Sequence, residues 1–248
     1  MISDIHIDYK ENRNWLDSLS HYDYINDGII LAGDVSENIT LIEEAFQILS
    51  SRFKEVFYVP GNHDLWVRFD NEINSFMKFQ KIKKVADNYG IHMKPFSLGC
   101  LSIIPLLSWY DYTFGEPDKE LINSWSDYFA CRWPKGKDMN EINDFFISMN
   151  HEYLKTKNEK IISFSHFMPS ISLLPSFIPS NKRFIYPVMG SALLMEQIKK
   201  LGSFLHVYGH SHINVHVKKE GVVYINNAFG YPHETLLTSK KLKCIHIE

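Results

Sequence analysis

The sequence predicts an α/β fold. Short apolar runs typical of buried strands alternate with stretches of helical character through the first half of the chain. Four of the apolar runs stop abruptly at glycine or serine, followed by residue types that bind metals. In sheets of α/β proteins, ligands collect beyond the carboxyl ends of strands, so this pattern also indicates where a functional site would form.

Capping and turn residues mark the helices predicted in the first ninety residues. Thr40 and Glu43 have the spacing of a capping box at the start of one helix, and Gly90 is suited to end the other. In chain order, we predict a strand over residues 29–32, a helix over 41–53, a strand over 56–60 and a helix over 71–88.

Proline and aromatic residues make the middle of the chain less regular. Pro105 lies inside an apolar run over residues 101–107, which places that predicted strand at a sheet edge or a bulge. Residues 109–137 are aromatic and irregular, and we expect them to leave the core as an excursion. The rest is predicted as a helix over 139–155, strands over 161–164 and 204–208, a helix over 191–201, and hairpins over 213–248 with a turn at Glu220-Gly221.

Composition and charge exclude several classes of function. The chain of 248 residues is long enough for one domain with a large core, and we expect residues 1–248 to form it. The net charge is −3, so nucleic acid is an unlikely partner unless a local basic patch exists. No run reaches the ~18 apolar residues that cross a bilayer, so no membrane partner is expected. Three widely spaced cysteines and no signal peptide predict a cytoplasmic protein with reduced thiols.

Five short motifs contain residue types that bind metals. They are Asp4-Ile5-His6, Gly33-Asp34, Gly61-Asn62-His63-Asp64, His166 and Gly209-His210-Ser211-His212. Each motif alone occurs by chance, but four of the five directly follow an apolar strand. Motifs far apart in the sequence can therefore converge at one edge of a sheet.

The order and types of these motifs resemble the calcineurin-like metallophosphoesterase family, over nearly the whole chain. The resemblance implies an α/β fold of two packed mixed β-sheets flanked by helices, with the metals at one edge. It also implies an assignment of residues. Asp4, His6 and His212 resemble ligands of a first metal, Asn62, His166 and His210 resemble ligands of a second, and Asp34 resembles the carboxylate that bridges them.

The chemistry of phosphate esters explains these residue types. Anionic phosphate oxygens repel a nucleophile, and two divalent metals ~3.5–4 Å apart offset that charge and ionise a shared water. Imidazole and carboxylate together suit Mn²⁺, Fe²⁺ or Zn²⁺ better than Ca²⁺. The resemblance therefore implies hydrolysis of a phosphate mono- or diester by a metal-bridging hydroxide. The substrate would be a phosphorylated small molecule or a phosphoprotein.

Residues beside the predicted ligands are candidates for acting on the substrate. In the resembled family, the histidine after the motif asparagine, here His63, protonates the leaving group or donates a hydrogen bond to the phosphate. In one branch of that family a carboxylate supports this histidine, and here Glu37 occupies its place, although a solvated loop glutamate is an equal alternative. Arg68 could bind phosphate through two parallel hydrogen bonds, or it could be an exposed arginine at a helix start.

Other polar and aromatic residues near the motifs are weaker candidates. Neighbours of ligands can orient them through hydrogen bonds, and aromatic residues can line a pocket, although such clusters are more often core. The candidates are Asp8 and Asp64 for orienting ligands, Trp109, Tyr110 and Asp111 for the pocket, and Asn226, Asn227 and His233 on a late loop near the metals.

The chain also departs from the family pattern. Only three residues precede Asp4, so either the first strand is very short or it begins upstream of this numbering. No arginine follows Gly33-Asp34, which argues against close similarity to the large serine/threonine phosphatases. The alternatives are an inactive protein-binding scaffold and a nuclease of the same chemistry. Because every expected ligand position is filled, we favour the enzyme.

Overall fold

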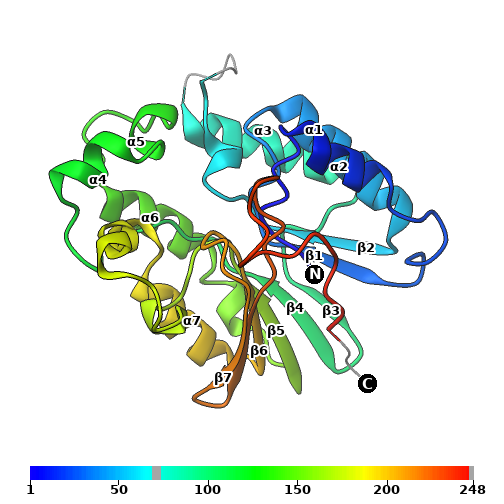
Figure 1. Ribbon diagram of the computed structural model, residues 1–248. Coiled ribbons are helices and arrows are strands. Elements are labelled where there is room, and N and C mark those ends of the chain that lie inside the picture. Colours follow the sequence, from blue (N-terminus) through cyan, green and yellow to red (C-terminus); the bar gives the residue numbers. More distant parts are fainter. Residues whose placement is uncertain (69–73, 246–248) are drawn as a thin grey trace.

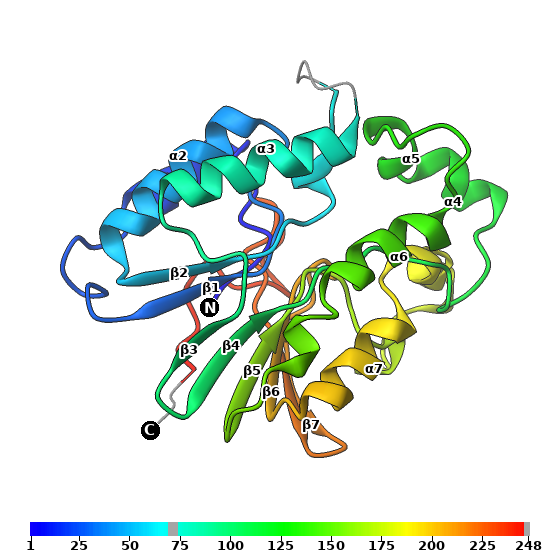
Figure 2. The same cartoon turned by 180° about the vertical axis from the view of Figure 1, so that it is seen from behind.

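Two β-sheets pack against each other in the centre of the molecule, and helices cover their outer faces (Figure 1, Figure 2). The structure, a computed structural model, describes residues 1–68 and 74–245. The smaller sheet pairs β1 and β2 in parallel, and the larger sheet is mixed, in the order β3-β4-β5-β6-β8-β7. The predicted α/β fold is confirmed. The strands are β1 (Gly28–Leu31), β2 (Glu55–Tyr58), β3 (Phe96–Leu98), β4 (Leu101–Pro105), β5 (Lys160–Phe164), β6 (Leu205–Tyr208), β7 (Val215–Lys219) and β8 (Val222–Asn226).

The helices form the two outer layers. Helices α1, α2 and α3 lie over the smaller sheet, and α6 and α7 lie over the larger one, as Figures 1 and 2 show from opposite sides. They are α1 (Lys10–Asp17), α2 (Ile39–Arg52), α3 (Ser75–Asn88), α4 (Lys119–Ser124), α5 (Asp127–Ala130), α6 (Met139–Met149) and α7 (Ala192–Leu201), with 3-10 segments η1 (His63–Leu65), η2 (Tyr153–Lys155), η3 (Ile171–Leu173) and η4 (Ser180–Val188).

Parallel pairing brings the motif loops to one edge. Strands β4, β5, β6 and β8 are parallel to one another, and β3 and β7 are antiparallel strands at the two edges. The motifs at residues 33–34, 61–64, 165–166 and 209–212 follow β1, β2, β5 and β6 directly. Their side chains therefore leave the sheets at neighbouring points.

Two predicted helix starts need correction. The N-cap of α2 is Asn38, whose side chain accepts a hydrogen bond from the backbone N–H of Thr40, so the predicted capping box at Thr40 is wrong. Both residues are good cap types, and the helix uses the earlier one. Helix α3 begins at Ser75 after its N-cap Asn74, whereas the start predicted at residue 71 lies outside the described residues.

The middle of the chain differs from prediction in three places. Strand β4 has a neighbour on each side, so it is no edge strand, and Pro105 is tolerated because it is the last residue of the strand. The excursion over residues 109–137 contains α4 and α5. The helix predicted over residues 139–155 ends at Met149, and a short 3-10 turn follows. The turn at Glu220-Gly221 is confirmed between β7 and β8, but the described residues after 226 add no further strand.

The first residues tie the two sheets together. Ile2 bridges to Leu31 at the end of β1, and Ser3 bridges to Ala228 just after β8. These isolated bridges fix the backbone that carries Asp4 and His6. Within the described part of the chain, no helix is both long and apolar enough to span a membrane.

Candidate metal centre

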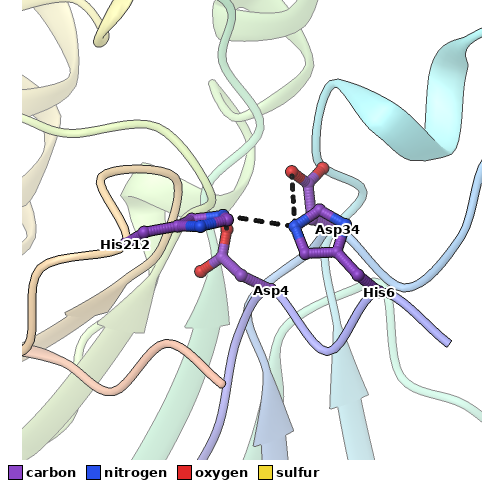
Figure 3. Close-up of side chains that lie close together, drawn as sticks. All are labelled: Asp4, His6, Asp34 and His212. Atoms are coloured by element: carbon purple, nitrogen blue, oxygen red, sulfur yellow. Dashed lines mark hydrogen bonds and ion pairs between the residues drawn. The ribbon is translucent and has the colours of Figure 1, made fainter. Parts of the chain in front are cut away.

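Four side chains from distant segments meet at the carboxyl ends of the strands (Figure 3). Asp4 and His6 come from the first segment, Asp34 follows β1, and His212 follows β6. Their potential ligand atoms all lie within 4.8 Å of one another. The His6 and His212 rings point toward each other, with their Nε2 atoms 3.2 Å apart. We call these residues the first ligand set.

A second ligand set shares Asp34 with the first. The ligand atoms of Asp34, His166 and His210 also lie within 4.8 Å of one another, and all three residues are buried. His166 Nε2 is 3.1 Å from both His210 Nδ1 and the Asn62 side-chain oxygen, which places Asn62 in this set. The structure thus brings all seven predicted ligands together.

In three of the histidines, one ring nitrogen forms a hydrogen bond directed away from the cluster. The other ring nitrogen faces the cluster and remains available to bind a metal. When one ring nitrogen is occupied by a carbonyl or carboxylate, the other is the natural metal ligand. The partners are the Ala32 carbonyl for His166 Nδ1 (2.9 Å), the Val188 carbonyl for His210 Nε2 (3.0 Å) and the Glu234 carboxylate for His212 Nδ1 (2.6 Å).

The electrostatic environment of the cluster also favours a bound cation. Burial raises the pKa of Asp34 well above its usual range, and the charges of Asp4 and Asp64 add to this rise. Burial also opposes ionisation of Asp4, but the hydrogen bond and charge of His212 outweigh it and hold the Asp4 pKa below its usual range. Burial lowers the pKa of His212, yet Asp4 and Glu234 together raise it to about 10. The charged form of Asp34 is thus disfavoured by burial and by its neighbouring carboxylates, and a cation bound beside it would offset both effects. Imidazole, carboxylate and amide donors in this setting suit divalent Mn, Fe or Zn.

Most of the predicted ligands have an unusual backbone conformation. Positive φ angles are uncommon outside glycine and cluster at functional sites. Here five candidate ligands have them: Asp4 (53°), His6 (38°), Asp34 (55°), His210 (68°) and His212 (50°). The turns that produce these angles let side chains from successive loops face inward together.

Gly61 leaves the space into which the shared carboxylate fits. A Cβ atom added at this position would lie 2.1 Å from Asp34 Oδ1 and 2.7 Å from His166 Cε1. No side chain fits at these distances, so glycine is required for Asp34 and His166 to approach the loop after β2.

Asp64 connects the two loops that present Asp34 and Asn62. Its buried carboxylate accepts hydrogen bonds from the backbone N–H groups of Asp34 (2.9 Å) and Gly61 (2.8 Å) and from the Tyr58 hydroxyl (2.9 Å). It also accepts from the N–H groups of residues 35 and 36. The expected orienting role of Asp64 therefore has a structural basis. Asp8, also a candidate, accepts a hydrogen bond from the Ser36 hydroxyl (2.6 Å).

His63 lies at the edge of the cluster, with 17% of its side chain exposed. Its Nε2 is 3.9 Å from Asp34 Oδ2, and its ring stacks on Trp66 with centroids 3.7 Å apart. The Tyr231 hydroxyl lies 3.4 Å from the same Nε2. His63 is thus near both ligand sets while remaining open to a ligand.

Glu37 pairs with Arg68 rather than with His63. Its carboxylate accepts from Arg68 Nε (3.0 Å) and Nη2 (2.8 Å), and the guanidinium lies over the Trp66 ring, 4.6 Å from the centroid. No contact between Glu37 and His63 is found among the described residues, so the expected support of His63 by Glu37 is wrong. Arg68 nevertheless lies near His63, because both side chains contact the ring of Trp66.

The weaker candidates take mostly structural positions. Trp109 and Tyr110 are fully buried, which places them in the core rather than in a substrate pocket. Asp111 accepts hydrogen bonds from Asn143 and Ser191 and is also structural. On the late loop, Asn226 donates to the Gly209 carbonyl and so supports the loop of His210 and His212, Asn227 donates to the Met1 and Lys241 carbonyls, and His233 stacks on Tyr231.

Three residues of the site were missed by sequence reasoning. Tyr231 and Glu234 lie in a Tyr-Pro-His-Glu segment after the last strand, where only His233 had been singled out. Asp127 comes from α5 and accepts from the Asn62 side-chain NH₂ (2.8 Å), which turns the Asn62 oxygen toward His166. An acidic residue directly among the aromatic residues of the excursion was the available signal for Asp127.

Comparisons with known proteins agree with this geometry. The family model described as calcineurin-like phosphoesterase matches residues 1–214. An [acyl-carrier-protein] phosphodiesterase, PptH, from Mycobacterium tuberculosis is 25% identical over 94% of this chain and 78% of its own length. The uncharacterised protein L509 of Acanthamoeba polyphaga mimivirus is 23% identical over 94% of this chain and 91% of its own length.

Among solved structures, that of the phosphopantetheinyl hydrolase PptH from Mycobacterium tuberculosis superimposes on this chain with a TM-score of 0.77. It is 22% identical in sequence, and the match covers 93% of this chain and 88% of that structure. This likeness supports the fold described above.

Proposed function

We propose that this chain, which belongs to the calcineurin-like phosphoesterase family and is a metal-dependent phosphoric ester hydrolase, hydrolyses phosphodiesters at a centre of two divalent metals. The observation that carries the proposal is Asp34, whose carboxylate belongs to both ligand sets. A carboxylate shared by two sets suits two cations held close together, an arrangement that stabilises the attacking and leaving oxygens of a phosphoester.

Each ligand set would hold one metal. Asp4, His6 and His212 would bind the first together with Asp34, and Asn62, His166 and His210 would bind the second with the same carboxylate. When bound, the metals offset the negative charge of the phosphate and lower the pKa of the water that attacks phosphorus. Mn, Fe and Zn are the proposed metals, because the set mixes imidazole with carboxylate.

His63 is the proposed proton donor to the leaving group. Its Nε2 faces the Asp34 carboxylate, and Trp66 and Tyr231 hold its ring. During hydrolysis the bond from phosphorus to the leaving oxygen breaks, and the oxygen of water stays on phosphorus. The leaving oxygen then takes its proton from His63.

Metal content and diesterase activity together test the proposal. We expect about two metals per chain after reconstitution with Mn²⁺ or Zn²⁺ and hydrolysis of bis(p-nitrophenyl) phosphate. Asp34→Asn should lose metal and activity together, whereas Asp17→Asn on an exposed face of α1 should lose neither. One metal per chain in an active wild-type protein, or full activity in Asp34→Asn, would contradict the two-metal proposal.

The role of His63 has its own test. His63→Ala should retain both metals and lower kcat by about 100-fold or more, the usual contribution of general acid catalysis. His216→Ala is the matched control, because His216 is exposed on β7, away from the loops that carry the ligand sets. Equal activity in the two variants would remove His63 from the mechanism.

The substrate proposed first is a phosphopantetheinylated carrier protein. It is suggested by the printed activity of the relative PptH, an acyl-carrier-protein phosphodiesterase. Incubating holo-acyl-carrier protein with the metal-loaded enzyme should release phosphopantetheine, seen by mass spectrometry as conversion to the apo form. An unchanged carrier protein alongside cleavage of bis(p-nitrophenyl) phosphate would reject this substrate and keep the diesterase. Faster hydrolysis of p-nitrophenyl phosphate would favour a monoesterase.

Arg68 is proposed to contact the substrate phosphate from the rim of the site. Its side chain is 41% exposed, and its guanidinium contacts Glu37 and Trp66. Arg68→Gln should raise KM for bis(p-nitrophenyl) phosphate while metal content stays constant, because a guanidinium binds phosphate oxygens in bidentate fashion. An unchanged KM would leave Arg68 with a structural role only.

Two broader features complete the proposal. We propose that residues 1–248 form one domain, because the buried apolar cluster runs from Met1 through both sheets to residues after β8. A cytoplasmic location is proposed because Cys100 and Cys244 are free and exposed, which suits a reducing compartment. Limited proteolysis and cell fractionation would check the two statements separately.

A further inference from the structure

Asp127 is a carboxylate of the excursion that is only 2% exposed. Three side-chain donors among the described residues point at it. Its Oδ1 accepts from Asn62 Nδ2 (2.8 Å) and Trp66 Nε1 (2.6 Å), and its Oδ2 accepts from Trp125 Nε1 (2.8 Å). Burying a carboxylate is costly unless such donors satisfy it. The three hydrogen bonds therefore match the ionised form of Asp127.

The bond to Asn62 fixes which end of its amide faces the metal centre. An ionised carboxylate only accepts hydrogen bonds, so the NH₂ group must face Asp127 and the amide oxygen must point elsewhere. That oxygen lies 3.1 Å from His166 Nε2, in the second ligand set. An NH₂ group that donates to an anion also shifts electron density toward its own carbonyl oxygen. Asp127 therefore both orients the Asn62 oxygen and strengthens it as a metal ligand.

The same oxygen of Asp127 also holds the indole that carries His63. The Trp66 N–H donates to Oδ1, and the Trp66 ring stacks on the His63 imidazole with centroids 3.7 Å apart. One carboxylate oxygen thus contacts a proposed metal ligand, Asn62, and the aromatic ring beneath the proposed proton donor.

Asp127 also stands where the excursion meets two of the ligand loops. Trp125, which donates to Oδ2, packs edge-on against the ring of His210 with centroids 5.9 Å apart. At the end of α5, the Ala130 carbonyl accepts from the Val67 N–H at 2.8 Å. Figure 2 shows α5 next to the start of α3. The excursion is therefore fixed beside both the loop after β2 and the loop after β6.

We propose that Asp127 is a positioning residue that orients the Asn62 oxygen for the second metal and, through Trp66, the ring of His63. The inference rests on the proposed two-metal diesterase and assigns one carboxylate to both a ligand and the proton donor. Loss of this carboxylate would weaken the binding of one of two metals. It would also lower kcat when both metals are bound.

A second buried carboxylate of the excursion supplies the matched control. Asp111 also accepts from an asparagine NH₂ group, that of Asn143 (3.0 Å), and contacts no ligand set among the described residues. Asp127→Ala should weaken one of two metal-binding steps about 10- to 100-fold, and Asp111→Ala should leave both unchanged. Titration calorimetry of the metal-free proteins with Zn²⁺ measures the two steps. Equal affinities in the two variants would overturn the inference.

The isosteric variant Asp127→Asn guards against misfolding of Asp127→Ala. It keeps the volume of the side chain and one acceptor oxygen, which can still face Asn62 and Trp66. We expect Asp127→Asn to bind the weakened metal more tightly than Asp127→Ala does, and less tightly than wild type, because its hydrogen bonds are no longer charge-assisted. Wild-type affinity in Asp127→Asn would contradict a role for the charge of the carboxylate.

A double variant tests the action through Trp66. Trp66→Phe keeps an aromatic ring beside His63 and removes the N–H that donates to Asp127. At saturating metal it should lower kcat about tenfold, because a small displacement of a reacting group is costly. Adding Trp66→Phe to Asp127→Ala should lower kcat no further, since both break the same path to His63. Losses that multiply would overturn that path. Trp133→Phe, whose indole packs on Trp109, is the control and should leave kcat unchanged.

A spectroscopic signature separates this inference from the proposed function. In protein labelled with ¹⁵N-tryptophan, the indole N–H protons of Trp66 and Trp125 should resonate downfield of that of Trp109, which has no hydrogen-bond partner among the described residues. Asp127→Ala should move both signals upfield. These shifts and the weakened metal step would support the inference even if wild type cleaved no diester. Unchanged indole signals, metal affinities and kcat in Asp127→Ala would overturn it and keep the diesterase.

Discussion

The hydroxyl of Tyr231 lies 3.4 Å from Nε2 of His63, whose ring stacks on Trp66. Tyr231 also packs on His6, with ring centroids 4.5 Å apart. One tyrosine thus contacts a predicted metal ligand through its ring and the proposed proton donor through its hydroxyl. We predict that Tyr231 positions the ring of His63, the proposed proton donor.

Replacing the hydroxyl alone tests this positioning role. Tyr231→Phe should lower kcat about three- to tenfold, the worth of one hydrogen bond, with KM, metal content and Tm little changed. The pH profile of kcat should also shift, since the hydroxyl contacts the nitrogen that carries the proton. Tyr9→Phe is the control, because Tyr9 packs against Tyr231 at 5.5 Å without contacting His63. A loss of metal in Tyr231→Phe would show a purely structural role.

Glu234 should govern metal affinity through His212. Its carboxylate lies 2.6 Å from His212 Nδ1 and leaves Nε2 directed at Asp4 and His6. Glu234→Gln should weaken metal binding about 10- to 100-fold, the usual effect of removing such a partner. Dialysis against graded chelator followed by elemental analysis measures this loss.

A surface pair gives the control for Glu234. Glu55 and His92 form a carboxylate–imidazole contact of the same length, 2.6 Å, away from the ligand sets. Glu55→Gln should leave metal affinity unchanged. If both variants kept wild-type affinity, the orienting role of Glu234 would be rejected.

The strand ends and their motifs could be predicted from sequence because local pattern decides them. Runs such as residues 29–32 are apolar enough to be buried whatever surrounds them, and the glycine after three of the four runs permits the turn. Parallel pairing of β5 and β6 brings His166 and His210 together, and the packing of the two sheets brings Asp34 to them. The motifs were therefore visible in the local sequence, whereas the family resemblance implied which seven residues are ligands and how they divide between two metals.

Partners that depend on tertiary packing could not be predicted. Asp127 meets Asn62 across 65 residues, and Glu234 meets His212 only because the chain turns back after β8. Trp109 looked like a pocket residue, yet Trp133 and Phe167 pack against it in the core. Sequence cannot show which way an aromatic ring faces when core and pocket are both apolar.

Asp64 should be required for the stability of the metal-binding loops. Asp64→Asn replaces an acceptor of five hydrogen bonds with a group that carries two donors, so several buried N–H groups lose their partner. The free energy of unfolding should fall by roughly 3 kcal/mol, measured by urea titration of the metal-free protein. Asp87→Asn, on the exposed face of α3, should change it little. Similar values for the two variants would contradict the role of Asp64.

His206 should make the metal-free protein sensitive to acid. It is buried between the hydroxyls of Ser163 and Ser165, and burial lowers its pKa to about 3. Between the unfolded pKa of about 6.5 and this value, the unfolded chain binds a proton that the folded chain does not. The contribution of this group to the free energy of unfolding is therefore fully present above that window. It declines as pH falls, by up to about 1.4 kcal/mol per pH unit.

His206→Gln should flatten the decline in urea titrations across the window, and the exposed His216→Gln should not. Parallel curves for wild type and His206→Gln would show that another buried group sets the acid sensitivity.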